Sequence, residues 1–346
     1  MEVIRYREEL FSIAKKIFAV DSPSGYTHTV IDLLRTMAED LGYSFETTRK
    51  GCGVITIEGR DNSRTVAMSA HVDTLGAMVR SITGNGQLMF TPVGGPILPT
   101  LDGEYCKVRT RDGREYTGTI LSLSPSVHVF PDSTARTRDA DNMSVRIDEK
   151  VCSEEEVKAL GIQPGDYIFF DPKTVVTPSG FLKSRFIDDK GSAACLMTLL
   201  KIMKEENLTP AYRTKFFFSV YEEVGHGASY LPADITELVA VDMGCIGLDL
   251  SCSEYQVSIC AKDSGGPYDY ELTSRLVNLA KENAVDYAVD IYPRYGSDVG
   301  AALHGGNDIR GALIGPGVHA SHGMERTHAD GLENTIRLAA LYLGLQ

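Results

Sequence analysis

The chain has 346 residues, enough for one large domain or two ordinary ones. Hydrophobic residues make up 43% of the chain and charged residues 23%, as in ordinary soluble globular proteins. The formal net charge is -13 and no run of basic residues is present, which argues against a nucleic-acid partner and against an anionic membrane surface.

The chain lacks the features of a membrane or secreted protein. No apolar stretch reaches the ~20 residues that a membrane-spanning helix needs, and the first ten residues form a charged amphipathic segment rather than a signal peptide. Seven cysteines are scattered without a C-x-x-C pair, which argues against a disulfide framework and a cysteine-type zinc site. We therefore expect a cytoplasmic protein.

The first 74 residues are predicted to contain two helices and two strands. Apolar residues recur at helical spacing around 10–17 and 30–41, and strands are predicted at 53–59 and 65–70. From about 75 to 178 the pattern changes to short alternating runs separated by Gly, Pro and Asp turns. The segment GIQPGDYIFFDP (161–172) ends this stretch with a turn and a strand. The stretch is typical of a small, barrel-like β-rich module.

Helices and strands alternate again after the segment FIDDKG (186–191). Helices are predicted at 192–206, 271–284 and 332–344, and strands at 215–220, 237–244, 287–293 and 311–317. This alternation is typical of an α/β sheet covered by helices. We predict one α/β domain with a mixed sheet flanked by helices, formed by 1–74 and 179–346, with the β-rich module 75–178 inserted into it.

Carboxylate and imidazole side chains follow the predicted strands or open the 192–206 helix. In doubly wound α/β domains, functional sites gather at the carboxyl ends of the strands. The residues concerned are His71 and Asp73, Asp188 and Asp189, Glu222 and Glu223, Asp242, and His319, His322 and His328. Such ligands suit zinc, cobalt or manganese, and the excess of carboxylates suits two ions bridged by one Asp. Two ions about 3.5–4 Å apart can polarise a carbonyl and lower the pKa of a shared water, as in many hydrolases.

Each of these segments has a simpler explanation when it is taken alone. The aspartates of FIDDKG could cap the following helix, and YEEVG (221–225) could be a solvated turn. Two adjacent carboxylates at the end of a buried strand nevertheless need a positive partner nearby. Ligand-type side chains at five separate strand ends favour a metal site over five unrelated turns.

The ordered segments SAHVDTLG, FIDDKG, YEEVG, VDMG and HASHGMERTH resemble a known family of metallopeptidases. This is the glutamyl aminopeptidase and tetrahedral (TET) aminopeptidase family of dinuclear enzymes, within the clan of co-catalytic zinc exopeptidases. The inserted β module and its end GIQPGDYIFFDP are also family-like, so the resemblance covers nearly the whole chain. It implies a zinc-exopeptidase-like catalytic domain and an aminopeptidase that removes N-terminal residues from short peptides.

The resemblance also implies a set of metal ligands. His71 and Asp242 would hold the first ion, and Asp188 would bridge both ions. Glu223 and a late histidine would hold the second ion.

Two further residues would act beside the ions. Asp73 would orient His71 through its ring N–H, and Glu222 would be the general base that takes a proton from the metal-bridging water and returns it to the leaving amine. The peptide bond between Asp188 and Asp189 is cis in relatives, which sequence alone does not reveal.

The late histidine is the position at which the chain departs from the family pattern. Relatives show an aromatic residue, then x-His-Ser, then a Glu a few residues on, whereas the order here is Ser-His-Gly-Met-Glu. Counting back from Asn334 in the closing helix favours His322. His319 and His328 stay open as alternatives.

The segment YGSDVGAA (295–302) resembles the family's substrate-pocket loop. It implies that Asp298 lies near the substrate's N-terminal residue, where a carboxylate favours a free α-ammonium group; a helix cap by Ser297 or Asp298 is the alternative. The family also implies that the β module mediates dimerisation and that dimers can assemble into a hollow tetrahedral dodecamer.

Three other functions fit part of the pattern. A carboxypeptidase or deacylase of the same clan would keep the metals and present Arg185 or Arg294 to a substrate carboxylate. A metal-independent glycoside hydrolase would use two of the carboxyl groups alone. A non-catalytic binding protein would have lost part of the ligand set.

Overall fold

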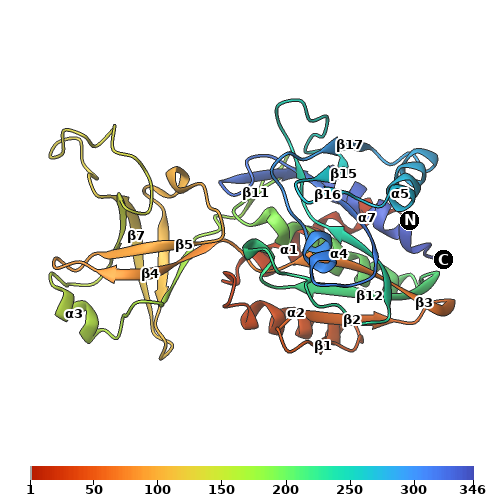
Figure 1. Cartoon of the computed structure of the whole chain (residues 1–346), viewed down its shortest axis with the longest axis horizontal. Coiled ribbons are helices and arrows are strands. Elements are labelled where there is room, and N and C mark those ends of the chain that lie inside the picture. Colours follow the sequence, from red (N-terminus) through yellow and green to blue (C-terminus); the bar gives the residue numbers. More distant parts are fainter. Residues whose placement is uncertain (1) are drawn as a thin grey trace. The chain divides into compact units, whose positions relative to one another are not determined.

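The computed structural model describes residues 2–346 and divides into two compact units (Figure 1). One unit is formed by the chain up to Thr74 together with Lys173–Gln346, and the other is Leu75–Pro172. The inserted module was predicted to end at 178. In the structure, the second unit ends at Pro172, and residues 173–178 belong to the first unit. Within residues 2–346, no helix combines the length and the apolar character that a membrane span requires.

The first unit is built on a ten-stranded mixed sheet (Figure 1). Its order is β1 (Glu46–Thr47), β2 (Gly53–Ile57), β12 (Tyr212–Ser219), β3 (Asp61–His71), β13 (Ile235–Val241), β18 (Arg310–Val318), β15 (Val257–Asp263) and β16 (Gly266–Pro267). In addition, β14 (Gly244–Cys245) pairs with β18, and β17 (Tyr287–Ile291) pairs with β15. The four central strands β12, β3, β13 and β18 are parallel. Each of them contains a buried, mostly apolar run, as expected where both faces of a sheet are covered.

Helices cover this sheet. They are α1 (Arg7–Phe18), α2 (His28–Asp40), α4 (Ile187–Glu205), α5 (Tyr270–Glu282), α6 (Asp298–His304) and α7 (Ala329–Leu343), with short 3₁₀ turns η1 (Val3–Tyr6) and η3 (Glu222–Val224). Helix α4 is buried along almost its whole length and packs on β3 between α1 and α7. The apolar stripe of α1, which includes Leu10, Ile13 and Ile17, is buried as its spacing predicts.

A second, three-stranded sheet lies in the same unit. It consists of β10 (Val175–Val176), β11 (Phe181–Ser184) and β19 (Glu325–His328), in which β11 pairs antiparallel with both neighbours. Ser184 pairs with Glu325 at one end of the β11–β19 ladder. The end of β11, which leads into α4, therefore lies beside the start of β19.

The second unit is a closed six-stranded barrel. Its order is β4 (Gly76–Ile82), β5 (Leu88–Val93), β8 (Met143–Ile147), β7 (Glu115–Ser122), β6 (Tyr105–Arg109) and β9 (Tyr167–Phe170), with β9 pairing back to β4. The turn η2 (Leu98–Leu101) and helix α3 (Glu154–Ala159) complete it. Alternating residues such as Cys106 and Val108 point into the barrel and are buried. The predicted fold class, a mixed sheet flanked by helices with an inserted barrel-like module, is confirmed.

Candidate metal centre

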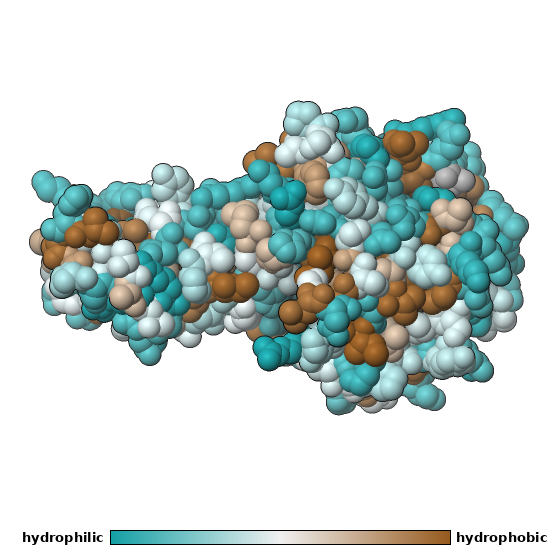
Figure 2. Space-filling model, turned by 90° about the horizontal axis from the view of Figure 1, so that it is seen from above, coloured by the Kyte–Doolittle hydropathy of each residue, from teal (hydrophilic) through white to brown (hydrophobic). Residues whose placement is uncertain are grey.

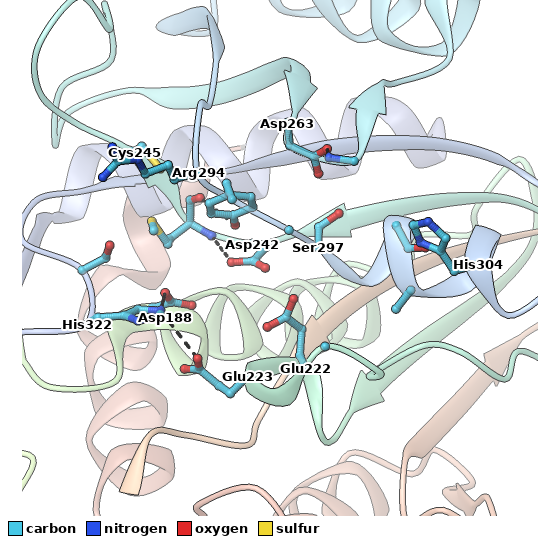
Figure 3. Close-up of a pocket in the computed structure, with 18 residues that line it drawn as sticks. Asp188, Glu222, Glu223, Asp242, Cys245, Asp263, Arg294, Ser297, His304 and His322 are labelled. Atoms are coloured by element: carbon cyan, nitrogen blue, oxygen red, sulfur yellow. Dashed lines mark hydrogen bonds and ion pairs between the residues drawn. The ribbon is translucent and has the colours of Figure 1, made fainter. Parts of the chain in front are cut away.

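The predicted ligands meet at one edge of the large sheet. His71 ends β3 and pairs with Ser219 at the end of β12, so the strands that precede His71 and Glu222 stop side by side. Asp242 directly follows β13. Figure 3 shows the side chains of Asp188, Glu222, Glu223, Asp242 and His322 gathered around one cavity. Parallel strands bring residues distant in sequence to this edge because their carboxyl ends coincide.

Three segments reach the site through left-handed backbone at residues other than glycine. Phe186 and Tyr221 both have φ of 69°, and His322 has φ of 62°. Phe186 lies two residues before Asp188, and Tyr221 lies directly before Glu222. Such conformations are unfavourable for residues with a Cβ and cluster at functional sites. Helix α4 is assigned from Ile187, but Asp188 and Asp189 have non-helical φ/ψ angles and are joined by a cis peptide bond, so the regular helix follows them.

Asp188 lies between two histidines. Its Oδ1 is 3.1 Å from Nε2 of His71, and its Oδ2 is 3.5 Å from Nε2 of His322. Nε2 of His322 is also 3.5 Å from Oε2 of Glu223. A carboxylate with one oxygen directed at each of two imidazoles has the arrangement that a bridging ligand requires.

Asp73 connects His71 to the two glutamates. Its buried carboxylate accepts the backbone N–H of Glu222 at 3.1 Å and that of Glu223 at 3.3 Å, and it accepts the hydroxyl of Ser24 at 2.5 Å. Nδ1 of His71 is 3.0 Å from the Asp73 carbonyl oxygen and 3.6 Å from its Oδ1. Asp73 therefore holds both the imidazole ring and the turn that carries the glutamates.

The acidic groups of the site disfavour one another's charge. Burial and repulsion from Asp188 raise the pKa of Asp242 to about 7. Burial likewise raises the pKa of Glu222 and that of Glu223 well above the ordinary value. The pKa of Asp188 is lowered instead, because hydrogen bonds from His322 and His71 outweigh its burial. Divalent cations would relieve the repulsion among these carboxylates.

Two overlapping groups of side chains offer metal-ligand atoms, and within each group these atoms all lie within 4.8 Å of one another. The first is His71, Asp188 and Glu223, and the second is His71, Asp189 and Asp242. Oε1 of Glu223 is buried and has no hydrogen-bond partner within residues 2–346, as expected for an atom that faces a cation. The donor set therefore fits divalent metal ions. Asp189, which was expected near the site but on neither ion, accepts the backbone N–H of His71 at 3.2 Å.

The three late histidines have different environments. His322 lies in the turn between β18 and β19 and faces Asp188 and Glu223. His328 caps α7: its Nδ1 accepts the N–H of Asp330, and its Nε2 donates to the carbonyl of Ser179. His319 is exposed and forms a backbone bridge. Of the three, the structure brings His322 to the cluster.

A cavity of about 460 Å³ opens onto the cluster. Beyond the acidic residues and His322, its wall includes Met243, Cys245, Asp263, Arg294, Tyr295, Ser297 and His304. Arg294, considered for binding a substrate carboxylate, lies on this wall, whereas Arg185 is buried and donates to the carbonyl of Gly323.

Asp298 is buried beside the site. It is 3% exposed; its Oδ2 accepts the hydroxyl of Ser219 at 2.6 Å, and its Oδ1 accepts the N–H of Ala228 at 2.9 Å. Its carboxylate therefore supports the segment after Glu223, and its contact with the substrate's N-terminal residue stays a prediction. The neighbouring Ser297 is the residue on the cavity wall.

Sequence reasoning gave no role to three supporting residues. Ser24 contacts Asp73 and Ser219 contacts Asp298, but no local pattern marks either serine. Glu325 accepts the backbone N–H of Asp188 and that of His322, each at 3.0 Å. Its position three residues after His322 was the available signal.

Comparison with known proteins finds a matching family and a related sequence. The family model of the M42 glutamyl aminopeptidases matches residues 51–338. The chain is 44% identical over 334 residues to "Putative aminopeptidase YhfE" of Bacillus subtilis, with 96% of each chain covered.

Solved structures share the fold at lower identity. Aminopeptidase APDkam598 of the archaeon Desulfurococcus kamchatkensis is 22% identical, with a TM-score of 0.88 over 98% of this chain and 95% of that chain. The Pyrococcus horikoshii TET1 peptidase, described as able to assemble into a tetrahedron or a large octahedral shell, is 22% identical, with a TM-score of 0.83 over 96% of this chain and 99% of that chain.

The matches and the donor set together confirm the predicted activity, which is that of a metal-dependent aminopeptidase, a hydrolase of peptide bonds. The family model spans most of the chain, and the related sequence spans nearly all of it. The chain belongs to the M42 glutamyl aminopeptidase family.

Proposed function

We propose that this aminopeptidase holds two divalent ions and removes the N-terminal residue of short peptides. Zinc or cobalt suits the mixed imidazole and carboxylate donors best, with manganese as a third candidate. The observation that carries the proposal is the position of Asp188, which directs one oxygen at His71 and the other at His322. His71 and Asp242 would complete the first ion's ligands, and Glu223 and His322 those of the second.

The bound ions and Glu222 would have different roles in the proposed hydrolysis. Bound ions would polarise the scissile carbonyl and lower the pKa of the attacking water. Glu222 faces the cavity, and its Oε2 is 3.7 Å from Nε2 of His71, so it can take a proton from that water and deliver it to the leaving amine.

The adjacent glutamates have separate tasks in this proposal. Asp73 fixes both of their backbone N–H groups, so that neither side chain is needed to hold the turn. Asp298 holds the following segment at Ala228. The side chain of Glu223 is thereby available as a ligand and that of Glu222 as a base.

Metal removal tests the proposed function. Dialysis against a chelator should abolish hydrolysis of aminoacyl p-nitroanilides, and zinc or cobalt should restore it, whereas N-acyl amino acids should not be hydrolysed. Full activity in the chelator would contradict the metal role. Hydrolysis of N-acyl amino acids in place of anilides would favour a deacylase.

Replacement of His322 by Ala should weaken the second ion selectively. The imidazole faces Asp188 and Glu223, which are the other proposed ligands of the second ion. Its loss leaves His71, Asp242 and Asp188 in place for the first ion. We expect the metal content to fall from about two to about one ion per chain after dialysis, with His328→Ala as the matched control that retains both. A His322→Ala protein with full metal content would exclude His322 as a ligand.

We also propose a cytoplasmic homo-oligomer in which the barrel unit mediates dimerisation. Within residues 2–346 all seven cysteines are free of disulfides, which fits a reducing compartment. The barrel unit exposes Val127 and Val129, by 65% and 71%, and apolar patches are visible on its surface in Figure 2. A dimer could assemble further, up to a tetrahedral dodecamer. Light scattering of the purified protein measures its oligomeric state.

A further inference from the structure

The buried carboxylate of Glu325 connects two segments that lie far apart in the sequence. Its Oε2 accepts the backbone N–H of Asp188, and its Oε1 accepts the backbone N–H of His322, both at 3.0 Å. Glu325 is 2% exposed. A carboxylate that binds two backbone N–H groups in this way is acceptor-only and has each oxygen directed at the protein. Glu325 is therefore placed to support the ligands of the site rather than to bind an ion itself.

The strand pairing explains why a residue at this position can reach both segments. Ser184, the last residue of β11, pairs with Glu325, the first residue of β19. The chain leaves β11 toward Asp188 at the same end at which the turn with His322 enters β19. Glu325 stands where the two segments meet, and the contact from Arg185 to the Gly323 carbonyl joins the same segments a second time.

The hydrogen bond from the backbone N–H of His322 to Glu325 stabilises an unfavourable backbone conformation at His322. His322 has φ of 62°, a left-handed conformation that a residue with a Cβ adopts reluctantly. The turn is closed by backbone hydrogen bonds between His319 and Arg326 and from Gly323 to Ala320, and the N–H of His322 is bound by Glu325. Loss of that acceptor would free the residue to leave the left-handed region, which would swing the imidazole away from Asp188.

We propose that Glu325 is a positioning residue that fixes the spacing between Asp188 and His322, and thereby sets the affinity of the site for its ions. This inference rests on the proposed function, because it assumes that these two residues bind metal. It concerns the backbone behind the ligands, so it predicts a change in metal affinity with no change in the ligand atoms themselves.

Glu325→Gln tests the proposal with little change in volume. The amide offers one oxygen acceptor, and its NH₂ group would face the second backbone N–H, so one of the two bonds is lost. The matched control is Glu237→Gln. Glu237 is equally buried and is paired with Arg275, but it lies near the start of β13, at the opposite end of the strand from Asp242.

The measurement is titration of the metal-free proteins with Co²⁺, without peptide, followed by the visible absorption of the bound ion. Glu325→Gln should weaken at least one of the binding steps about 10–100-fold and change the absorption bands, and excess Co²⁺ should restore turnover. Glu237→Gln should bind like the unmodified protein. Circular dichroism of the metal-free proteins checks folding.

A second variant keeps the test decisive if Glu325→Gln does not fold. Glu325→Asp retains the charge but is one methylene shorter, so it can make one of the two contacts, and an intermediate loss of affinity is expected. Unmodified binding by whichever of these variants folds would overturn the positioning role while leaving the proposed function intact. If the unmodified protein itself bound no Co²⁺, the metal centre and this inference would fall together.

Discussion

Glu222→Gln should lower turnover by roughly 10²- to 10⁴-fold while the protein keeps its metal ions. The substitution preserves the size of the side chain and leaves the backbone N–H of Glu222 bound to Asp73, so the turn should not move. An amide, however, cannot carry the proton from the attacking water to the leaving amine. The measurements are kcat on an aminoacyl p-nitroanilide and metal content by mass spectrometry.

Glu223→Gln is the matched control for this prediction, because it changes the neighbouring residue in the same way. The carboxylate of Glu223 faces His322, and its buried Oε1 has no hydrogen-bond partner among residues 2–346, so the control should lose metal together with activity. If Glu222→Gln lost metal instead and Glu223→Gln kept it, the two roles would have to be exchanged.

Asp188→Asn should remove both ions and reduce hydrolysis to background. The amide is no longer anionic, and its NH₂ group would face one of the two imidazoles that the carboxylate now serves. We expect the metal content to fall from about two ions per chain to well below one, because a bridging ligand belongs to both ions.

Asp290→Asn provides the comparison for Asp188→Asn. Asp290 is also a largely buried aspartate that accepts backbone N–H groups, from Ser251 and Cys252, but it lies on β17, away from the cluster. It should keep its metal. Retention of both ions by Asp188→Asn would rule out the bridging role.

The fold was largely predictable because its signals are local. Apolar periodicity marks the helices, continuous apolar runs mark the central strands, and turn residues mark the barrel. The carboxyl-terminal boundary of the barrel unit was harder to predict. Residues 173–178 include β10, which is a short strand like those of the barrel but pairs with β11 in the first unit. A pairing partner distant in sequence leaves no mark on a short strand.

The candidate site was predictable in its residue types and less so in its geometry. His71, Asp188, Glu223 and Asp242 could be proposed because each follows a strand or opens a helix. Nothing local indicates that Phe186 and Tyr221 adopt left-handed backbone, since neither is glycine. The ligand roles of His71, Asp188, Glu223 and Asp242 stay predictions.

Tertiary contacts account for what the sequence could not reveal about Asp298 and Glu325. Asp298 was expected near the substrate, but nothing in the sequence indicated that Ser219 and Ala228, which lie 79 and 70 residues away, donate to its two carboxylate oxygens. Glu325 gains its position from the pairing of β11 with β19. In both cases a partner comes from a segment that is distant in the sequence, and no spacing rule connects the two.

Anomalous diffraction from crystals loaded with zinc or cobalt tests the central claim most directly. Two peaks about 3.5–4 Å apart are expected, with Asp188 between them, His71 and Asp242 on one ion, and Glu223 and His322 on the other. A single peak, or peaks that do not contact Asp188, would contradict the two-ion account.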